Sequence, residues 1–353
     1  MFIRAEYHCS NICIFDSRRN ILMREQRMSI RITGTGSYLP DKVMTNRDFE
    51  KIIDTSDDWI IKRTGIRHRH YVTDGMDNCG MCVHAANEAM RQAGIKPADL
   101  GGIVVATCTP ETSVPSTASR VQRELGIPEC FAFDINAACT GFMYALKAAG
   151  GLMSGNGKPI LVCGSETLSR FMNINDRGSC ILFADGAGAA VVLPGDNLKY
   201  FEIYSKPDYD HTIEINGMNM PMGGEPASDM NGKPLSSYVT LKGKEVYVYS
   251  TREVERVINR AMDELGITVD DADWFLMHQA NVRIIRAAAA RLGIPDQKCF
   301  VNIDSVANTS AASVPLALDH MNKKGLMKKG DTIVIAAFGG GLTSACAVYE
   351  WDI

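Results

Sequence analysis

A long-range internal repeat constrains the fold of this chain more than any other feature of its sequence. The letters AMRQAGI at residues 89–95 return as AMDELGI at residues 261–267. Farther along, LGIP at residues 125–128 returns unchanged at residues 292–295. Because the two pairs keep their order and nearly keep their spacing, we expect two halves that share one structural plan.

The predicted secondary structure follows one order in both halves. A helix of 3.6-residue period ends at Gly94 and another at Gly266, and an apolar strand follows each of them. After a second helix and strand, each half turns into a third helix and closes with apolar strands. The predicted strands are 103–106, 131–135, 160–162 and a hairpin of 181–183 with 189–192 in the first half, and 274–277, 300–303, 332–335 and 343–348 in the second.

This alternation of strands and helices predicts an α/β fold with a mixed sheet, flanked by helices, in each half. We place the first half at residues 28–200 and the second at residues 201–353. Ligands of open α/β sheets bind beyond the carboxyl ends of the strands. The loops of both halves are therefore expected to meet at one shared cleft.

Residues 1–27 lie outside the repeat. They hold five arginines and three acidic residues, and they lack an apolar core of signal-peptide length. A new start is suggested by Met28, which directly precedes the first strand-like residues. We expect a disordered leader or an upstream start codon. An organelle transit peptide is the alternative, although serine is scarce there.

The composition narrows the class of protein further. The net charge is −4, so the chain has no overall electrostatic reason to bind nucleic acid or an anionic membrane. No apolar run reaches the roughly 20 residues needed to span a bilayer. Eleven scattered cysteines are typical of reduced thiols in a cytoplasmic protein. The CxxC spacing of Cys79 and Cys82 fits a helix surface or core position better than a metal or redox site, since no second ligand pair is near.

Cys139 is the first candidate for chemistry. It lies in AACTG at residues 137–141, between a predicted strand and a predicted helix. A thiol at a helix N-terminus has a lowered pKa, which favours the nucleophilic thiolate. The small neighbours leave room for an acyl group. A buried, inert cysteine is the equally weighted alternative.

Two further polar residues are expected at the same cleft. The interval from Cys130 to Cys139 equals that from Cys299 to Asn308, so Asn308 is predicted to be the repeat-mate of Cys139. A helix cap is the alternative role for this asparagine. His278 directly follows the predicted strand 274–277. A thiolate nucleophile with two side-chain donors supports acyl transfer.

These stretches together resemble beta-ketoacyl-[acyl-carrier-protein] synthase III, the family of initiating condensing enzymes of fatty acid synthesis. The resemblance runs from about residue 30 to the C-terminus. Its motifs are DTSDDWI at 54–60, RTGIR at 63–67, AACTG at 137–141, FADGAGA at 183–189, HQAN at 278–281, NTSAASVP at 308–315 and FGGG at 338–341. It implies the thiolase-like fold, with two pseudo-symmetric halves layered as αβαβα.

The resemblance implies a decarboxylative Claisen condensation of an acyl-CoA primer with malonyl-[acyl carrier protein]. Cys139 would attack the acyl-CoA, and the backbone amides of Cys139 and Gly340 would form the oxyanion hole. His278 and Asn308 would stabilise the enolate that forms when carbon dioxide leaves. No metal or redox cofactor is implied. The glycine run that contains Gly340 is by itself equally compatible with an ordinary hairpin turn.

Substrate and partner contacts are implied in the same way. For CoA these are Trp59 and Arg177 on the two faces of the adenine, Arg63 on the phosphates, and Thr55 and Asn281 along the pantetheine. For the acidic carrier protein they are Arg283, Arg286 and Arg291, which are otherwise a solvated helix face. The family also implies a cytoplasmic homodimer, with a loop that reaches the partner's acyl pocket.

Three positions depart from the family pattern. Val114 stands where an aromatic residue is common in that loop, which suggests a longer or branched primer. Ala307 replaces a common glycine, and residues 216–244 match poorly and could reshape the pocket entrance. Two alternative functions stay open: a condensing or acyl-transfer enzyme of secondary metabolism, and a non-catalytic scaffold with this fold.

Overall fold

Each half of the repeat forms one five-stranded mixed sheet in the computed structural model, which describes residues 30–153, 157–215 and 237–353. In the first sheet the strand order is β1-β7-β6-β4-β5, and in the second it is β12-β11-β13-β14-β8. The first sheet contains β1 (Arg31–Tyr38), β4 (Gly102–Ala106), β5 (Phe131–Ile135), β6 (Ile160–Thr167) and β7 (Asp185–Leu193). The second contains β8 (Leu198–Ser205), β11 (Trp274–Met277), β12 (Cys299–Phe300), β13 (Thr332–Gly339) and β14 (Thr343–Glu350).

The pairing confirms the predicted pseudo-symmetry. In the first sheet, β4 runs parallel to β5 and β6, and β7 runs antiparallel to β6 and β1. In the second sheet, β11 runs parallel to β12 and β13, and β14 runs antiparallel to β13 and β8. Every strand of one sheet therefore has a counterpart at the same place in the other.

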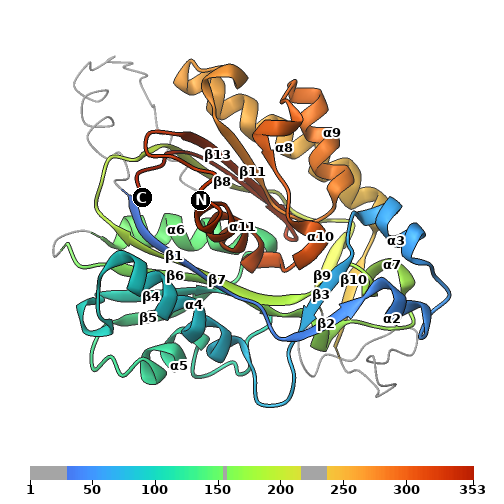
Figure 1. Ribbon diagram of the computed structural model, residues 1–353, viewed down its shortest axis with the longest axis horizontal. Helices are drawn as coiled ribbons and strands as arrows, with labels where there is room; N and C mark the ends of the chain where they lie inside the picture. Colours follow the sequence, from blue (N-terminus) through green and yellow to red (C-terminus); the bar gives the residue numbers. More distant parts are fainter. Residues whose placement is uncertain (1–29, 154–156, 216–236) are drawn as a thin grey trace, which may run out of the picture.

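The sheets and helices stack in the five layers of the expected αβαβα arrangement (Figure 1). Helices α6 (Gly141–Leu152) and α11 (Ser313–Lys323) lie between the sheets, and their apolar side chains share one core cluster with both sheets. Helices α4 (Asn78–Ala93) and α5 (Thr117–Glu124) cover the outer face of the first sheet. Helices α8 (Gly243–Leu265) and α9 (Val282–Leu292) cover the second. Because both sheet faces are covered, β4 and β6 are buried at every residue and show no polar alternation.

Shorter elements complete the side of the molecule where the site lies. Two small antiparallel sheets of two strands each pair β2 with β3 and β9 with β10. These elements are β2 (Lys42–Thr45), α2 (Asn46–Glu50), α3 (Asp57–Thr64), β3 (His68–Tyr71), α7 (Arg177–Cys180), β9 (Ile213–Ile215), β10 (Val239–Leu241) and α10 (Ile303–Val306). Single 3₁₀ turns include η2 (Ala138–Thr140) and η6 (Ser310–Ala312), η1 (Pro97–Asp99), η3 (Leu168–Phe171), η4 (Val269–Asp271) and η5 (Asp296–Lys298).

The structure corrects two of the predicted strands. Residues 181–183 form no hairpin with β7. Ile181 is the C-cap of α7, and Phe183 forms a single bridge to the backbone of Asn308, while β7 pairs with β1 and β6. The strand predicted at 300–303 is reduced to β12, because Ile303 already begins α10. The chain passes from the first sheet to the second between Leu193 and Leu198, slightly before residue 200.

Two sequence features fall wholly or partly outside the described residues. The leader at residues 1–27 lies outside them, as does most of the segment 216–244 that matches the family poorly. Within the ranges given above, no helix is both long enough and apolar enough to cross a membrane.

Candidate active site

Cys139 lies where two cavities meet. It follows Ala138, whose φ of 45° turns the chain sharply from β5 into η2, and α6 begins just beyond it. A positive φ in a residue other than glycine is costly and is often found at functional sites. One cavity of about 490 Å³ leads from Cys139 past His278 to Trp59. A second of about 490 Å³ lies on the other side and includes Gly340. A thiol placed here can react with a group that enters through either cavity.

The position at a helix N-terminus does not give Cys139 the lowered pKa that the sequence led us to expect. Burial raises the pKa of the Cys139 thiol to about 12, and the Glu166 carboxylate acts in the same direction. A hydrogen bond from Ser310 and the backbone amide of Cys139 itself oppose this rise without offsetting it. At neutral pH the sulfur is therefore a protonated thiol, because the cost of burying a charge outweighs the effect of the helix N-terminus.

His278 continues from the end of β11 into the same cavity. Its backbone amide donates to the Ala336 carbonyl at 2.9 Å, and its ring packs edge-on against Phe338 with centroids 5.3 Å apart. Burial lowers the pKa of His278 to about 3, so its imidazole is neutral at neutral pH. Within the described chain, neither ring nitrogen has a hydrogen-bond partner. A buried polar group without a partner is costly, and a ligand oxygen in this cavity would supply one.

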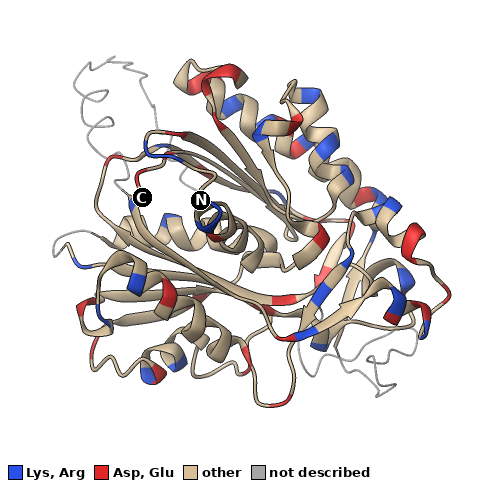
Figure 2. Ribbon diagram, viewed as in Figure 1, with Lys and Arg blue, Asp and Glu red and all other residues tan. Residues whose placement is uncertain are grey.

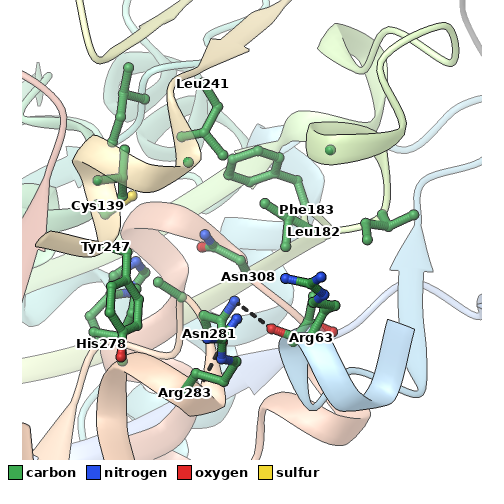
Figure 3. Close-up of a pocket in the computed structure, with 18 of the residues that line it drawn as sticks. Arg63, Cys139, Leu182, Phe183, Leu241, Tyr247, His278, Asn281, Arg283 and Asn308 are labelled. Atoms are coloured by element: carbon green, nitrogen blue, oxygen red, sulfur yellow. Dashed lines mark hydrogen bonds between the residues drawn. The ribbon is translucent and has the colours of Figure 1, made fainter. Parts of the chain in front are cut away.

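Asn308 is buried beside them and is fixed by its own backbone. Its amide donates to the Leu182 carbonyl at 3.0 Å, and its carbonyl accepts from Ala184 at 2.9 Å. The side-chain Oδ1 accepts from the Ser310 amide at 2.9 Å. This bond orients the side-chain amide, so a ligand in the cavity meets its Nδ2 donor. Figure 3 shows Cys139, His278 and Asn308 around one cavity.

The structure assigns a different repeat-mate to Asn308 from the one predicted. Asn136 Oδ1 accepts from the Ala138 amide, just as Asn308 Oδ1 accepts from the Ser310 amide. Ala138 and Ser310 share the unusual φ values of 45° and 47°. Asn308 therefore corresponds to Asn136, and Cys139 corresponds to Ala311. The prediction from spacing was wrong because the two connecting segments differ: helix α10 lies between β12 and η6, whereas β5 leads to η2 without a helix.

The glycine turn that follows β13 packs directly against the cysteine turn. A Cβ added to Gly339 would come within 2.8 Å of the Cys139 amide nitrogen, so only glycine fits there. The next residue, Gly340, lines the second cavity together with Cys139. The two backbone segments expected to form the oxyanion hole are thus neighbours.

The mouth of the first cavity carries the residues expected to bind CoA. The guanidinium of Arg177 lies 4.8 Å from the ring centroid of Trp59, and that of Arg63 lies 5.7 Å from it. Asn281 donates to the Arg63 carbonyl at 3.1 Å and caps α9 by accepting from the Arg283 amide at 2.9 Å. This side chain joins the end of α3 to the start of α9, as the dashed lines in Figure 3 show.

Other expected site residues lie farther from the reacting groups. Arg283 lines the first cavity and stacks on Tyr247 at 5.5 Å, whereas Arg286 and Arg291 are exposed on α9 outside it. Arg291 also forms an ion pair with Glu255 at 3.3 Å. Val114 is 86% exposed, and Thr55 is not among the lining residues of the first cavity, although its hydroxyl is buried without a partner in the described chain.

A buried carboxyl group close to Cys139 was missed by the sequence reasoning. Glu166 is fully buried on β6 and accepts hydrogen bonds from the Thr109 hydroxyl at 2.5 Å and from the Cys108 thiol at 3.2 Å. Burial raises the pKa of Glu166, while these bonds and one from Ser310 act to lower it. Cys108 and Ser310 line the second cavity with Cys139. The sequence signal that could have revealed this group is an acidic residue, Glu166, shortly after the apolar strand predicted at residues 160–162.

The described residues contain no cluster of three or more potential metal ligands. The arrangement offers a thiol nucleophile, two neutral hydrogen-bond donors and adjacent backbone amides. The thiol of such a site can accept an acyl group, and the donors can stabilise negative charge that develops on a carbonyl oxygen. With the paired sheets, it defines a thiolase-like acyltransferase.

Comparison with solved structures agrees with this class. A 3-oxoacyl-[acyl-carrier-protein] synthase III from Aquifex aeolicus superposes with a TM-score of 0.82 at 40% identity, covering 91% of this chain and 100% of that one. The priming beta-ketosynthase of a polyketide biosynthetic pathway superposes with a TM-score of 0.82 at 31% identity, covering 92% and 96%.

Sequence comparison identifies the family. Models of the 3-oxoacyl-[acyl-carrier-protein] synthase III domain and of its C-terminal domain match residues 133–206 and 262–351. A beta-ketoacyl-[acyl-carrier-protein] synthase III of Desulfitobacterium hafniense is 42% identical, covering 92% of this chain and 98% of that protein. One of Clostridium novyi is 39% identical, covering 92% and 99%. The chain belongs to the beta-ketoacyl-[acyl-carrier-protein] synthase III family.

Proposed function

We propose that this chain condenses an acyl-CoA primer with malonyl-[acyl carrier protein] to give 3-oxoacyl-[acyl carrier protein], the initiating step of fatty acid synthesis. The observation that carries the proposal is that Cys139, His278 and Asn308 meet at one cavity, where the neutral imidazole of His278 has no hydrogen-bond partner among the described residues. The full-length similarity to beta-ketoacyl-[acyl-carrier-protein] synthase III proteins supports it.

In the first step the sulfur of Cys139 attacks the thioester carbonyl of the primer. A carbon–sulfur bond to Cys139 forms, the bond to the CoA sulfur breaks, and the leaving CoA takes up the proton that the thiol gives away. The amides of Cys139 and Gly340 donate to the carbonyl oxygen while it carries negative charge. The close packing of Gly339 against Cys139 supports this pairing of amides.

In the second step a malonyl thioester loses carbon dioxide, and the resulting enolate attacks the acyl group on Cys139. The new carbon–carbon bond forms as the bond to the Cys139 sulfur breaks. His278 and Asn308 donate to the enolate oxygen. A neutral imidazole suits this role, since the low pKa of His278 keeps it uncharged and able to donate one N–H.

The first cavity is the route for the CoA and carrier-protein arms. Trp59 supplies an aromatic face for the adenine, and the guanidinium groups of Arg177 and Arg63 both stack on its ring. A base placed between an indole and a guanidinium is bound by stacking on both sides. Arg63 binds the phosphates, and Asn281 lines the pantetheine path.

Basic residues around this mouth form the docking surface for the acidic carrier protein. Lys and Arg positions follow α9 and continue onto α3, as Figure 2 shows. We assign the contact to Arg283, Arg286 and Arg291. The ion pair of Arg291 with Glu255 leaves Arg283 and Arg286 as the stronger contributors.

We also propose that two copies of the chain associate through β5. This strand is the edge of the first sheet, and Phe131 on it is 36% exposed. The highly exposed Val114 then reaches the second cavity of the partner and leaves room there for a longer or branched primer. A monomer mass in light scattering would contradict the proposed dimer. Turnover with acetyl-CoA and with no longer or branched primer would contradict the proposed role of Val114.

A specialised condensing enzyme of secondary metabolism is the second candidate, favoured by the similarity to a polyketide priming synthase. The assay that separates the two supplies malonyl-[acyl carrier protein] or malonyl-CoA with a panel of acyl-CoA primers. We expect a 3-oxoacyl product only with the carrier-protein substrate. Equal or better turnover with malonyl-CoA or another acceptor would favour the specialised enzyme, and no product with any pair would favour a scaffold.

A further inference from the structure

Two threonine hydroxyls connect the cysteine turn to the glycine turn. Thr140 directly follows Cys139, and Thr343 begins β14 just after the glycine run. Their Oγ1 atoms lie 2.8 Å apart and are buried. Thr140 Oγ1 lies 2.7 Å from the Ala137 carbonyl oxygen, and Thr343 Oγ1 lies 3.0 Å from the Gly340 carbonyl oxygen.

The number of hydrogens limits how this group can be bonded. Each hydroxyl carries one hydrogen, so a bond between the two hydroxyls can run in either direction. In one direction, Thr140 donates to Thr343, which donates to the Gly340 carbonyl or to the more distant Ala137 carbonyl at 3.4 Å. In the other direction, Thr343 donates to Thr140, which donates to the Ala137 carbonyl. In either direction a direct side-chain bond joins the two turns, and it ends on the backbone of one of them.

We infer that Thr140 and Thr343 are positioning residues that set the spacing of the two oxyanion-hole amides, a role that rests on the proposed function. The two turns come from different halves of the repeat and from different sheets. Packing of Gly339 against the Cys139 amide sets how closely the turns can approach. The hydroxyl pair resists their separation, and Thr343 is itself held by Tyr249, whose hydroxyl donates to the Thr343 carbonyl at 3.2 Å.

A small change in this spacing has a large effect on the rate of acylation. An oxyanion-hole donor acts on charge that exists only in the transition state, and it must lie at hydrogen-bond distance from that oxygen. Misplacement by about 1 Å costs on the order of 100-fold in rate. Neither threonine is among the residues that line the first cavity, the proposed route of CoA, and Thr140 lines neither cavity, whereas Thr343 lines the second. Loss of the pair should therefore slow acylation without weakening the binding of acyl-CoA.

The test compares Thr343→Val and Thr140→Val with wild type in two reactions of Cys139. Acylation by acyl-CoA uses the oxyanion hole, whereas alkylation by iodoacetamide displaces iodide and does not. We expect each valine variant to acylate about 10- to 100-fold more slowly, with an unchanged KM for acyl-CoA and an alkylation rate within about twofold of wild type. Thr343→Ser, which keeps the hydroxyl, should restore acylation.

Thr33→Val is the matched control, because the Thr33 hydroxyl also donates to a main-chain carbonyl, that of Val191, on the far edge of the first sheet. Wild-type acylation rates in both folded valine variants would overturn the inference. So would equal loss of acylation and alkylation, which indicates a disturbed Cys139. If wild type itself forms no acyl adduct, the proposed function fails instead. Should Thr343→Val not fold, Thr140→Val alone decides the question.

Discussion

Replacing Trp59 with alanine should separate recognition of the CoA nucleotide from the chemistry at Cys139. Trp59 lies at the outer end of the first cavity on α3, where two guanidinium groups already face its ring. Stacking of a base on an aromatic side chain contributes about 1–3 kcal/mol. Displacing an exposed cation–π contact costs about 0.5–1 kcal/mol of this.

The remaining contribution is about 0.5–2 kcal/mol, which corresponds to about 2- to 30-fold in affinity. Because this contact is the same in the ground state and the transition state, Trp59→Ala should raise KM for acyl-CoA by that factor and leave the saturated acylation rate unchanged. The assay measures acylation of Cys139 against concentration for acyl-CoA and for the acyl-pantetheine thioester, which lacks the adenine.

Only the acyl-CoA curve should move. An equal change with both thioesters would show that Trp59 supports the fold or the pantetheine path and not the adenine. No change with acyl-CoA would refute the assignment of this end of the cavity to the nucleotide. A melting curve checks that the variant is folded.

Four further outcomes follow from the site. Since burial holds the pKa of Cys139 at about 12, alkylation by iodoacetamide should rise about tenfold per pH unit from about pH 6 to about pH 9, and a plateau near neutrality would contradict this. Glu166→Gln removes the carboxyl group whose charge raises the pKa of Cys139 and should speed alkylation, whereas Ser310→Ala removes a hydrogen bond that lowers this pKa and should slow alkylation; the reverse order would refute these contributions. His278→Ala should still form the acyl-enzyme and lose about 100- to 1000-fold in condensation, and a loss confined to acylation would give His278 a different role. Arg286→Glu should raise KM for malonyl-[acyl carrier protein] severalfold while acylation by acyl-CoA stays unchanged, and an effect on both would argue against a docking role.

The repeat and the apolar runs were sufficient to predict the layered fold. Strands β5 and β11 begin and end where the sequence pattern places them, because each is a short apolar run bounded by polar loops, although β5 is only half-buried at the edge of its sheet. The run at 181–183 was taken for a strand because buried loops and buried strands share an apolar composition. Its real partner is the backbone of Asn308, a long-range contact that no local pattern contains.

The site was predictable residue by residue where one side chain ends an element, as for His278 after β11. It was not predictable where the result depends on packing. The raised pKa of Cys139 comes from burial and from Glu166, which lies on a separate strand. The equivalence of Asn308 with Asn136 comes from two matching backbone turns, which interval counting along the chain misaligns.

Intact-protein mass spectrometry after mixing with a panel of acyl-CoA thioesters tests the role of Cys139 most directly, with Cys139→Ala as the control. We expect an adduct of the acyl mass on the wild-type chain, its absence in the variant, and its disappearance when malonyl-[acyl carrier protein] is added. An adduct that persists in Cys139→Ala, or no adduct with any thioester, would contradict the assignment of Cys139 as the nucleophile.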